Sequence, residues 1–210
     1  MKNKMIVLIG SVLIIILTIY VRSTMSETEI PSYKVIKSFK NIEVREYDPV
    51  IVAQVQVAGE REKAINDGFR LLADYIFGNN ISKEKIAMTA PVMQQKGEKI
   101  PMTAPVTQVR ENDHWLVEFT MPSVYTMESL PKPNNSKVVL KRKEAGRCVV
   151  VRFSGLWNQN SMKENQDKLD IYVKDNDIGI SGPPTYAFYN PPWTLPFLRR
   201  NEIIYTIKEK

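Results

Sequence analysis

The sequence predicts an α+β domain of two similar halves, in which an antiparallel sheet forms a distorted barrel flanked by two helices. The main observation is an internal repeat. Residues 42–59, IEVREYDPVIVAQVQVAG, align without a gap with residues 138–155, VVLKRKEAGRCVVVRFSG. Each copy has the pattern of two strands joined by a turn and ending in glycine. A helical pattern and further strand-like segments follow each copy, which is typical of a pseudo-twofold domain.

The first copy predicts a β-hairpin. Residues 42–47 alternate apolar and charged side chains, which is the period of a half-buried strand. Asp48 and Pro49 then predict a turn, and residues 50–57 return as the second strand. The hairpin is expected to end at Gly59.

One helix is expected after each hairpin. The first is predicted over residues 60–77 and stops at Gly78. Its apolar stripe consists of Ile65, Phe69, Leu72 and Ile76. The second is predicted over residues 162–174, where Ser161 and Glu164 form a capping-box pattern. Its inner face consists of Met162, Leu169 and Val173, interrupted by Gln166. Later strands are expected at 115–121, 186–189 and 203–207.

Residues 85–92, KIAMTAPV, are nearly repeated at 99–106 as KIPMTAPV. Proline cannot donate a backbone hydrogen bond, so Pro91 and Pro105 place these segments at sheet edges or bulges. Met88 and Met102 are expected to fill the core rather than to bind a metal.

Residues 5–21 form an uninterrupted apolar run without charge. As a helix, this run would extend about 26 Å, which is the short end of a membrane span. Lys2 and Lys4 precede it, so we expect a single-pass anchor over residues 1–25 with the N-terminus in the cytoplasm. A linker at 26–33 would then lead to an extracytoplasmic domain at 34–210. The alternative is a cleaved signal peptide and a secreted domain, although the run lacks the small-residue cleavage pattern.

Composition narrows the function classes. The net charge is +6, and the basic residues before Glu27 supply half of it, so nucleic-acid binding is not expected. The single cysteine, Cys148, cannot form an internal disulfide and is expected to be buried in a strand. The single histidine, His114, is expected in an exposed turn. Zinc spacings, phosphate loops, dinucleotide fingerprints and nucleophile elbows do not occur in the sequence, so no enzymatic activity is expected.

Three features together resemble the SOUL haem-binding family over residues 33–207: KIAMTAPV, the preceding GFRLLADYIFG helix, and the ending YNPP…RRNEI. The chain looks like a membrane-anchored, bacterial-type member. The resemblance implies a pseudo-twofold α+β fold, which is also similar to the effector-binding domains of certain transcription regulators. It further implies non-covalent binding of haem or another porphyrin.

The resemblance suggests an apolar site near the first helix with cations for the propionates. We expect Phe69, Arg70 and Tyr75 on the exposed side of this helix to meet the C-terminal loop. The loop would contribute Trp193 and Phe197 for stacking and Arg199 and Arg200 for the carboxylates. The position of an axial histidine proposed for some relatives aligns with Glu46, so the iron ligand stays open. The helix positions that carry cations in some relatives align with Asn66 and Asp74, neither of which is basic.

Three functions are therefore compared. The first is tetrapyrrole binding for buffering, transport or sensing outside the cytoplasm. The second is an interaction protein that keeps the fold without the ligand, which the residue at position 46 favours. The third is an enzyme acting on a small hydrophobic substrate, which no motif supports. The ligand, protein partners and oligomeric state are left open.

Overall fold

The computed structural model describes residues 28–82 and 97–208. The predicted membrane segment and the first MTAPV copy, residues 85–92, lie outside these ranges. Within them, no helix is long and apolar enough to cross a membrane. The anchor stays a prediction from the sequence.

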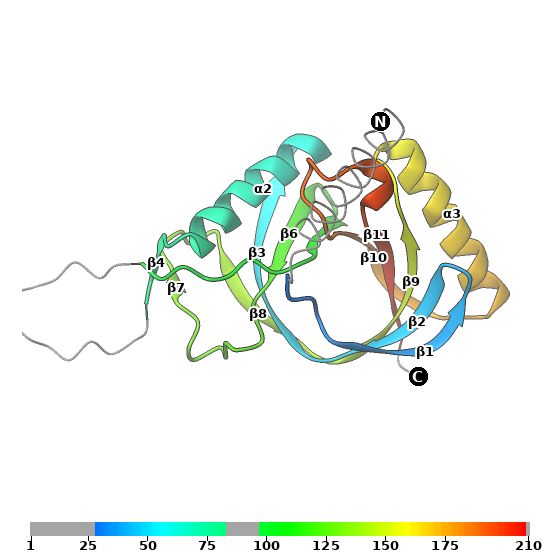
Figure 1. Cartoon of the computed structure of the whole chain (residues 1–210), viewed down its shortest axis with the longest axis horizontal. Helices are drawn as coiled ribbons and strands as arrows, with labels where there is room; N and C mark the ends of the chain where they lie inside the picture. The colour runs from blue at the N-terminus through cyan, green and yellow to red at the C-terminus, as the bar shows by residue number, and fades with distance from the viewer. Residues whose placement is uncertain (1–27, 83–96, 209–210) are drawn as a thin grey trace, which may run out of the picture.

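The described chain consists of two helices longer than one turn and eleven strands (Figure 1). The first half contains β1 (Tyr33–Phe39), β2 (Ile42–Tyr47), β3 (Val50–Ala58), α2 (Arg61–Ile76), β4 (Asn80–Ile81), β5 (Val106–Glu111) and β6 (His114–Thr120). The second half contains β7 (Lys132–Pro133), β8 (Val139–Lys143), β9 (Gly146–Phe153), α3 (Gln159–Asp175), β10 (Ile180–Phe188), the 3₁₀ turn η1 (Pro196–Leu198) and β11 (Asn201–Ile207).

The α+β fold and its pseudo-twofold symmetry are confirmed. Nine strands form one antiparallel sheet in the order β1-β2-β9-β11-β10-β5-β6-β3-β8. Apart from β1, each strand of one half has its counterpart at the mirrored place in the order. The sheet curls into an open barrel, with α2 packed on β3 and β6 and α3 on β9 and β11 (Figure 1). The strands β5 and β10 join the two halves.

The predicted hairpins are wrong in their pairing, although their strands are confirmed. β2 pairs with β9, and β3 pairs with β8, so neither copy folds back on itself. Tyr47 pairs with Gly146 and Val50 pairs with Lys143. Both repeat copies advance by three residues between these pairs, so the register is continuous. The two copies therefore run side by side as one long bent ribbon (Figure 1). Alternation of side chains determines which residues form strands but not which strands pair.

The helices lie close to their predicted ranges. α2 spans residues 61–76, and Gly78 follows with a left-handed φ of 115°, as a C-terminal stop requires. α3 begins three residues earlier than predicted, because Asn158 is its N-cap and accepts a hydrogen bond from the Ser161 amide. Gln166 lies on the sheet-facing side of α3, where it donates to the Tyr205 hydroxyl and accepts from the Tyr186 hydroxyl.

Each helix closes one of two cores. Beneath α2, the fully buried side chains include Leu72, Ile76, Val55 and Val117. Beneath α3, they include Leu169, Val149, Val151 and Ile203. Met102 does not fill a core as predicted: it is 45% exposed, because Ile100 takes the inward position in this segment at 3% exposure.

The first strand begins inside the segment predicted to be a linker. Tyr33 is the first residue of β1, and the residues before it already pack on the domain. The Glu29 carboxylate accepts a hydrogen bond from the Ser123 amide at 2.8 Å, and its carbonyl accepts one from the Ala104 amide at 2.9 Å. The short, mixed polar sequence of residues 28–33 contains no period from which this packing could be predicted.

Two ion pairs with buried carboxylates link strands across the sheet. Arg45 on β2 reaches over β9 to Glu202 on β11, with N–O distances of 2.9 and 3.0 Å. Toward the other end of the sheet, Lys143 on β8, whose side chain is 41% exposed, reaches over β3 to Glu118 on β6 at 2.6 Å. Both carboxylates are 1% exposed. Each ion pair thus links a strand to the strand two places away in the sheet order.

Candidate functional site

The loop from Tyr189 to Arg200 joins β10 to β11 and carries the densest cluster of exposed apolar side chains in the described chain. Trp193 is 73% exposed and Phe197 is 70% exposed. With them we define the loop patch as Leu156, Trp193, Leu195, Phe197 and Leu198, all more than one third exposed. Three prolines, at 191, 192 and 196, stiffen the loop. Large apolar groups held open in this way mark interaction surfaces.

The loop packs on the segment that leads into α3. The Gly155 amide donates to the Pro196 carbonyl at 2.8 Å. The Arg199 guanidinium donates from Nε to the Thr194 carbonyl at 2.7 Å and from Nη2 to the Pro192 carbonyl. It also lies over the Trp157 ring, 4.8 Å from its centre. Arg199 therefore holds the loop in shape from within.

Arg200 anchors the base of the loop in a buried network. Its Nη2 lies 2.8 Å from Glu202 Oε1, and its guanidinium lies over the Tyr189 ring at 3.9 Å. Glu202 also binds Arg45 and accepts from the Tyr189 hydroxyl at 2.7 Å. Burial alone would raise the pKa of Glu202, but the hydrogen bonds and charge of Arg45, the charge of Arg200 and the Tyr189 hydroxyl together outweigh it and hold the pKa below its usual value. Burial raises the pKa of Tyr189 well above its usual value.

The structure separates the predicted site residues into two groups. Arg200 is bound to Glu202 and is 17% exposed, so it is not open to a ligand. On α2, Arg70 is 78% exposed and pairs with Asp67, while Phe69 packs its edge on Phe119. Trp193 and Phe197 stay exposed on the loop, next to Arg199.

Tyr75 was predicted on the exposed side of α2, and this is wrong. It is 1% exposed, and its hydroxyl donates to the Pro131 carbonyl at 2.9 Å. The reason is that Leu72 and Ile76 both point into the core, and Tyr75, between them on the helix, shares their face. The Tyr75 hydroxyl can be buried without cost because the backbone carbonyl accepts its hydrogen bond.

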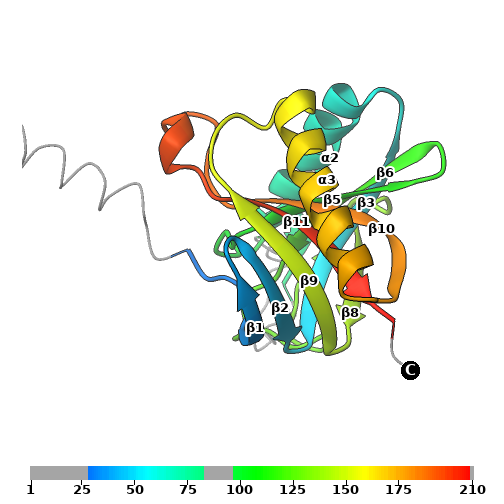
Figure 2. The ribbon, with the colours of Figure 1, turned by 90° about the vertical axis from the view of Figure 1, so that its right-hand side faces the viewer.

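The loop and α2 do not meet. No hydrogen bond, ion pair or ring contact among the described residues joins them, and Figure 2 shows the loop at the left edge of the domain with α2 behind α3. Arg61 in the first turn of α2 lies between the halves, over the rings of Trp115 and Tyr186, and donates to Gln108. Sequence reasoning missed Arg61 and Trp157, because both act through residues distant in the chain.

Candidate iron ligands lie away from the loop patch. His114 is exposed at the turn between β5 and β6, as predicted, and this hairpin lies on the opposite side of the domain from the loop (Figure 2). Glu46 pairs with Arg147 at 3.3 Å. In the described residues, no three His, Cys, Asp or Glu side chains are grouped as a metal site would need. Burial raises the pKa of the Cys148 thiol, so it stays protonated at neutral pH.

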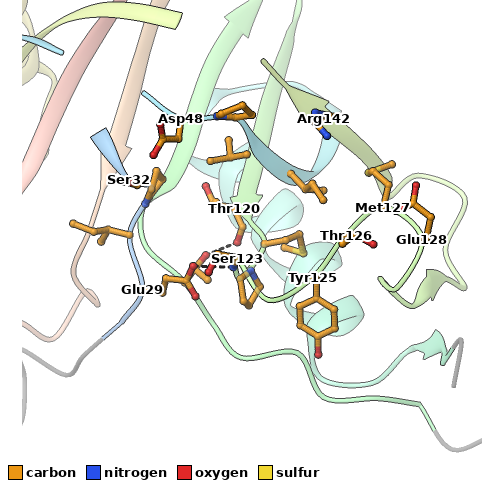
Figure 3. A pocket seen from close by; sticks show the side chains of 18 residues that line it. Glu29, Ser32, Asp48, Thr120, Ser123, Tyr125, Thr126, Met127, Glu128 and Arg142 are labelled. Carbon is orange, nitrogen blue, oxygen red and sulfur yellow. Dashed lines mark hydrogen bonds between the residues drawn. The ribbon is translucent and has the colours of Figure 1, made fainter. Parts of the chain in front are cut away.

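A cavity of about 520 Å³ opens between the segment before β1, the bend after β2 and the loop after β6 (Figure 3). Three carboxylates line it, those of Glu29, Asp48 and Glu128, against one guanidinium, Arg142. Arg142 itself pairs with Glu144 at 3.3 Å. A dianionic ligand would meet net negative charge here, so this cavity does not suit propionates.

A second groove, of about 340 Å³, lies between β1 and the end of α3. Its rim carries Lys37, Arg147 and Lys208 against one acid, Asp177. This charge suits carboxylates. Its one aromatic ring, Tyr172, is 9% exposed, so the groove presents no open aromatic face for a flat macrocycle.

The model of the SOUL heme-binding protein family matches residues 28–97 and 93–206. The chain belongs to the SOUL heme-binding family. This match covers nearly all of the described residues of the SOUL domain, including both repeat copies and the C-terminal loop. No curated protein matches the sequence.

Solved structures share the SOUL domain's fold at low identity. The C-terminal domain of EcmrR is 11% identical, with a TM-score of 0.57, and the match covers 85% of this chain and 99% of that one. An uncharacterized conserved protein from Listeria innocua is 13% identical with a TM-score of 0.54, covering 89% and 96%. A structure described as a hydrolase from Listeria innocua is 14% identical with a TM-score of 0.53, covering 82% and 94%. These likenesses show the fold alone.

The loop patch of the SOUL domain fits a tetrapyrrole in part. Two exposed aromatic rings and three exposed leucines offer a surface for a flat apolar macrocycle. Arg199 supplies one cation beside them. The fit lacks a wholly free arginine, because Arg199 donates to two loop carbonyls and Arg200 is committed to Glu202, and it lacks a histidine.

Proposed function

We propose that this SOUL protein binds a tetrapyrrole, without catalysis, on the loop patch. The observation that carries the proposal is the pair of largely exposed aromatic rings, Trp193 and Phe197, on a loop held in shape by hydrogen bonds. Preorganised aromatic side chains lose little freedom when a ligand stacks on them. Family membership supports haem or a related porphyrin as the ligand.

The protein would recognise the macrocycle rather than its iron. Trp193 and Phe197 would stack on the ring system, and Arg199 would pair with one propionate. His114, the single histidine, lies on the far side of the domain and would not reach this surface. Hemin and protoporphyrin IX are therefore expected to bind with similar affinity.

The proposed setting is outside the cytoplasm. Residues 5–21 would tether the domain to a membrane, or would be removed as a signal peptide from a secreted form. A non-catalytic binder in either place would buffer, carry or sense porphyrin. Nucleic acid is not an expected partner, because half of the net positive charge precedes the domain.

The test is a titration of the purified full-length protein in mild detergent with hemin and, in parallel, protoporphyrin IX. Binding would be followed in the Soret region. Replacing Trp193 and Phe197 by alanine is expected to weaken both ligands by about tenfold or more, since each stacked ring contributes about 0.5–1.5 kcal/mol beyond its area. Phe77→Ala is the matched control, because Phe77 is 61% exposed at the end of α2, away from the loop.

Equal affinity of the double variant and the wild type would reject the loop patch as the site. Hemin binding without protoporphyrin binding would reject recognition of the macrocycle and would make His114 and Met102 the next variants.

A second candidate is an interaction protein that keeps the fold without the ligand. Its support is Glu46, which stands at the aligned histidine position and pairs with Arg147 on the surface. It predicts no saturable binding of either porphyrin. Enzymatic activity would instead be seen as product that accumulates with time.

A further inference from the structure

The loop patch lies where the chain enters the domain. The Arg200 guanidinium, at the base of the loop, donates from Nη2 to the hydroxyl of Tyr33 at 3.3 Å. Tyr33 is the first residue of β1. Figure 2 shows the first described residues, in blue, and the loop, in red and orange, on the same left-hand side of the domain. The loop and the start of the domain therefore face the same way.

The apolar run at residues 5–21 ends seven positions before residue 28, where the described domain begins. Seven residues span at most about 25 Å when fully extended. If the run crosses a bilayer, residue 28 must stay within this distance of the lipid surface, and the loop lies on the same side of the domain as the first described residues (Figure 2).

The composition of the loop patch suits the lipid interface. Tryptophan and phenylalanine are typical of the boundary between headgroups and acyl chains, and leucines add buried area below it. Arg199 follows the patch directly, and its positive charge would face the phosphates, whereas Arg200 is committed to Glu202. The patch lies on the loop and its turn η1, and its exposed residues line neither of the two cavities described above.

From this geometry we infer that the loop patch docks on the surface of the bilayer that holds residues 5–21, inserting Trp193 and Phe197 into the lipid interface. The inference rests on the membrane tether of the proposed function. Docking and porphyrin stacking would use the same two aromatic rings, so a ring inserted into the lipid would not be stacked on a macrocycle at the same time.

The experiment places a single tryptophan in each of two forms of the full-length protein. The chain has three tryptophans, and none precedes residue 115, so the tether adds no signal. Trp115→Phe with Trp157→Phe leaves Trp193 as the probe. Trp157→Phe with Trp193→Phe leaves Trp115, which is 8% exposed on β6 and is the matched control. Both are reconstituted into vesicles of phosphatidylcholine and phosphatidylglycerol with brominated acyl chains.

Trp193 emission is expected to fall by about half in the brominated vesicles, because interfacial side chains sit about 5–10 Å into the lipid boundary. Trp115 emission should not change. If the substituted background unfolds, the difference between the wild type and Trp193→Phe alone gives the same quantity.

Vesicle flotation separates the possible failures. Protein that floats while Trp193 is quenched no more than Trp115 would overturn the docking and leave the tether intact. Protein that does not float would overturn both. Neither result affects the hemin titration in detergent, which tests porphyrin binding by itself.

Discussion

Replacing Arg45 by methionine tests the buried network that anchors the base of the loop. Arg45 is 1% exposed and Glu202 is fully buried, and two hydrogen bonds of 2.9 and 3.0 Å join them. Removing one partner of such a pair costs about 3–5 kcal/mol, because the other charge stays buried without compensation. Arg200 and Tyr189 still contact Glu202, at 2.8 and 2.7 Å, so we expect the lower end, about 3 kcal/mol.

For a domain of this size, a loss of about 3 kcal/mol lowers the melting temperature by about 6–12 °C. Urea unfolding of the full-length protein in detergent, followed by tryptophan fluorescence, measures the free energy directly. Arg45→Met combined with Glu202→Gln should recover part of the loss, because the buried carboxylate charge is then removed, while the partly exposed Arg200 loses its partner. Lys163→Met is the matched control: its ion pair with Asp167 is exposed, and no measurable change is expected. An Arg45→Met variant as stable as this control would refute the reasoning.

Three further predictions concern stability. Arg45 holds the pKa of Glu202 below its usual value, so ionised Glu202 stabilises the folded protein. This stabilisation is complete above the usual pKa and is lost as the pH falls through the lowered pKa. The urea midpoint should therefore fall in acid, and should fall less in Arg45→Met. Gly97→Ala places a methyl group against the backbone of Gly78 and should cost about 1–3 kcal/mol. Gly146→Ala, with open space around it, should show no such steric loss in the same urea assay. Asn158→Ala removes the α3 N-cap and should cost about 1 kcal/mol by thermal unfolding, whereas no loss would reject the cap.

The strands and helices could be predicted because their signals are local. Residues 42–47 alternate by two, and residues 65–76 repeat at helical spacing, so each pattern indicates its own structure. The N-cap of α3 at Asn158 was missed, since Ser161 offered a second local pattern three residues later. The sequence pattern alone does not show at which of the two capping residues the helix begins.

The candidate site could be predicted only in part. Trp193 and Phe197 stand in a proline-rich segment, where apolar rings have no regular element to bury them, and they are exposed. Arg199 and Arg200 are neighbours of identical type, yet one shapes the loop and the other is bound to Glu202. Nothing in the two residues themselves distinguishes these roles.

The repeat, the alternating faces and therefore the α+β class follow from local sequence patterns alone, because hydrophobic burial acts on each short segment separately. The pairing of β2 with β9, whose partners are 99 to 109 positions apart, and the contact of Arg45 with Glu202, 157 residues away, depend on the tertiary structure. Such contacts depend on which of several compatible strand edges closes the sheet. The same closure placed the loop beside Tyr33 and far from α2, and so divided the predicted site in two.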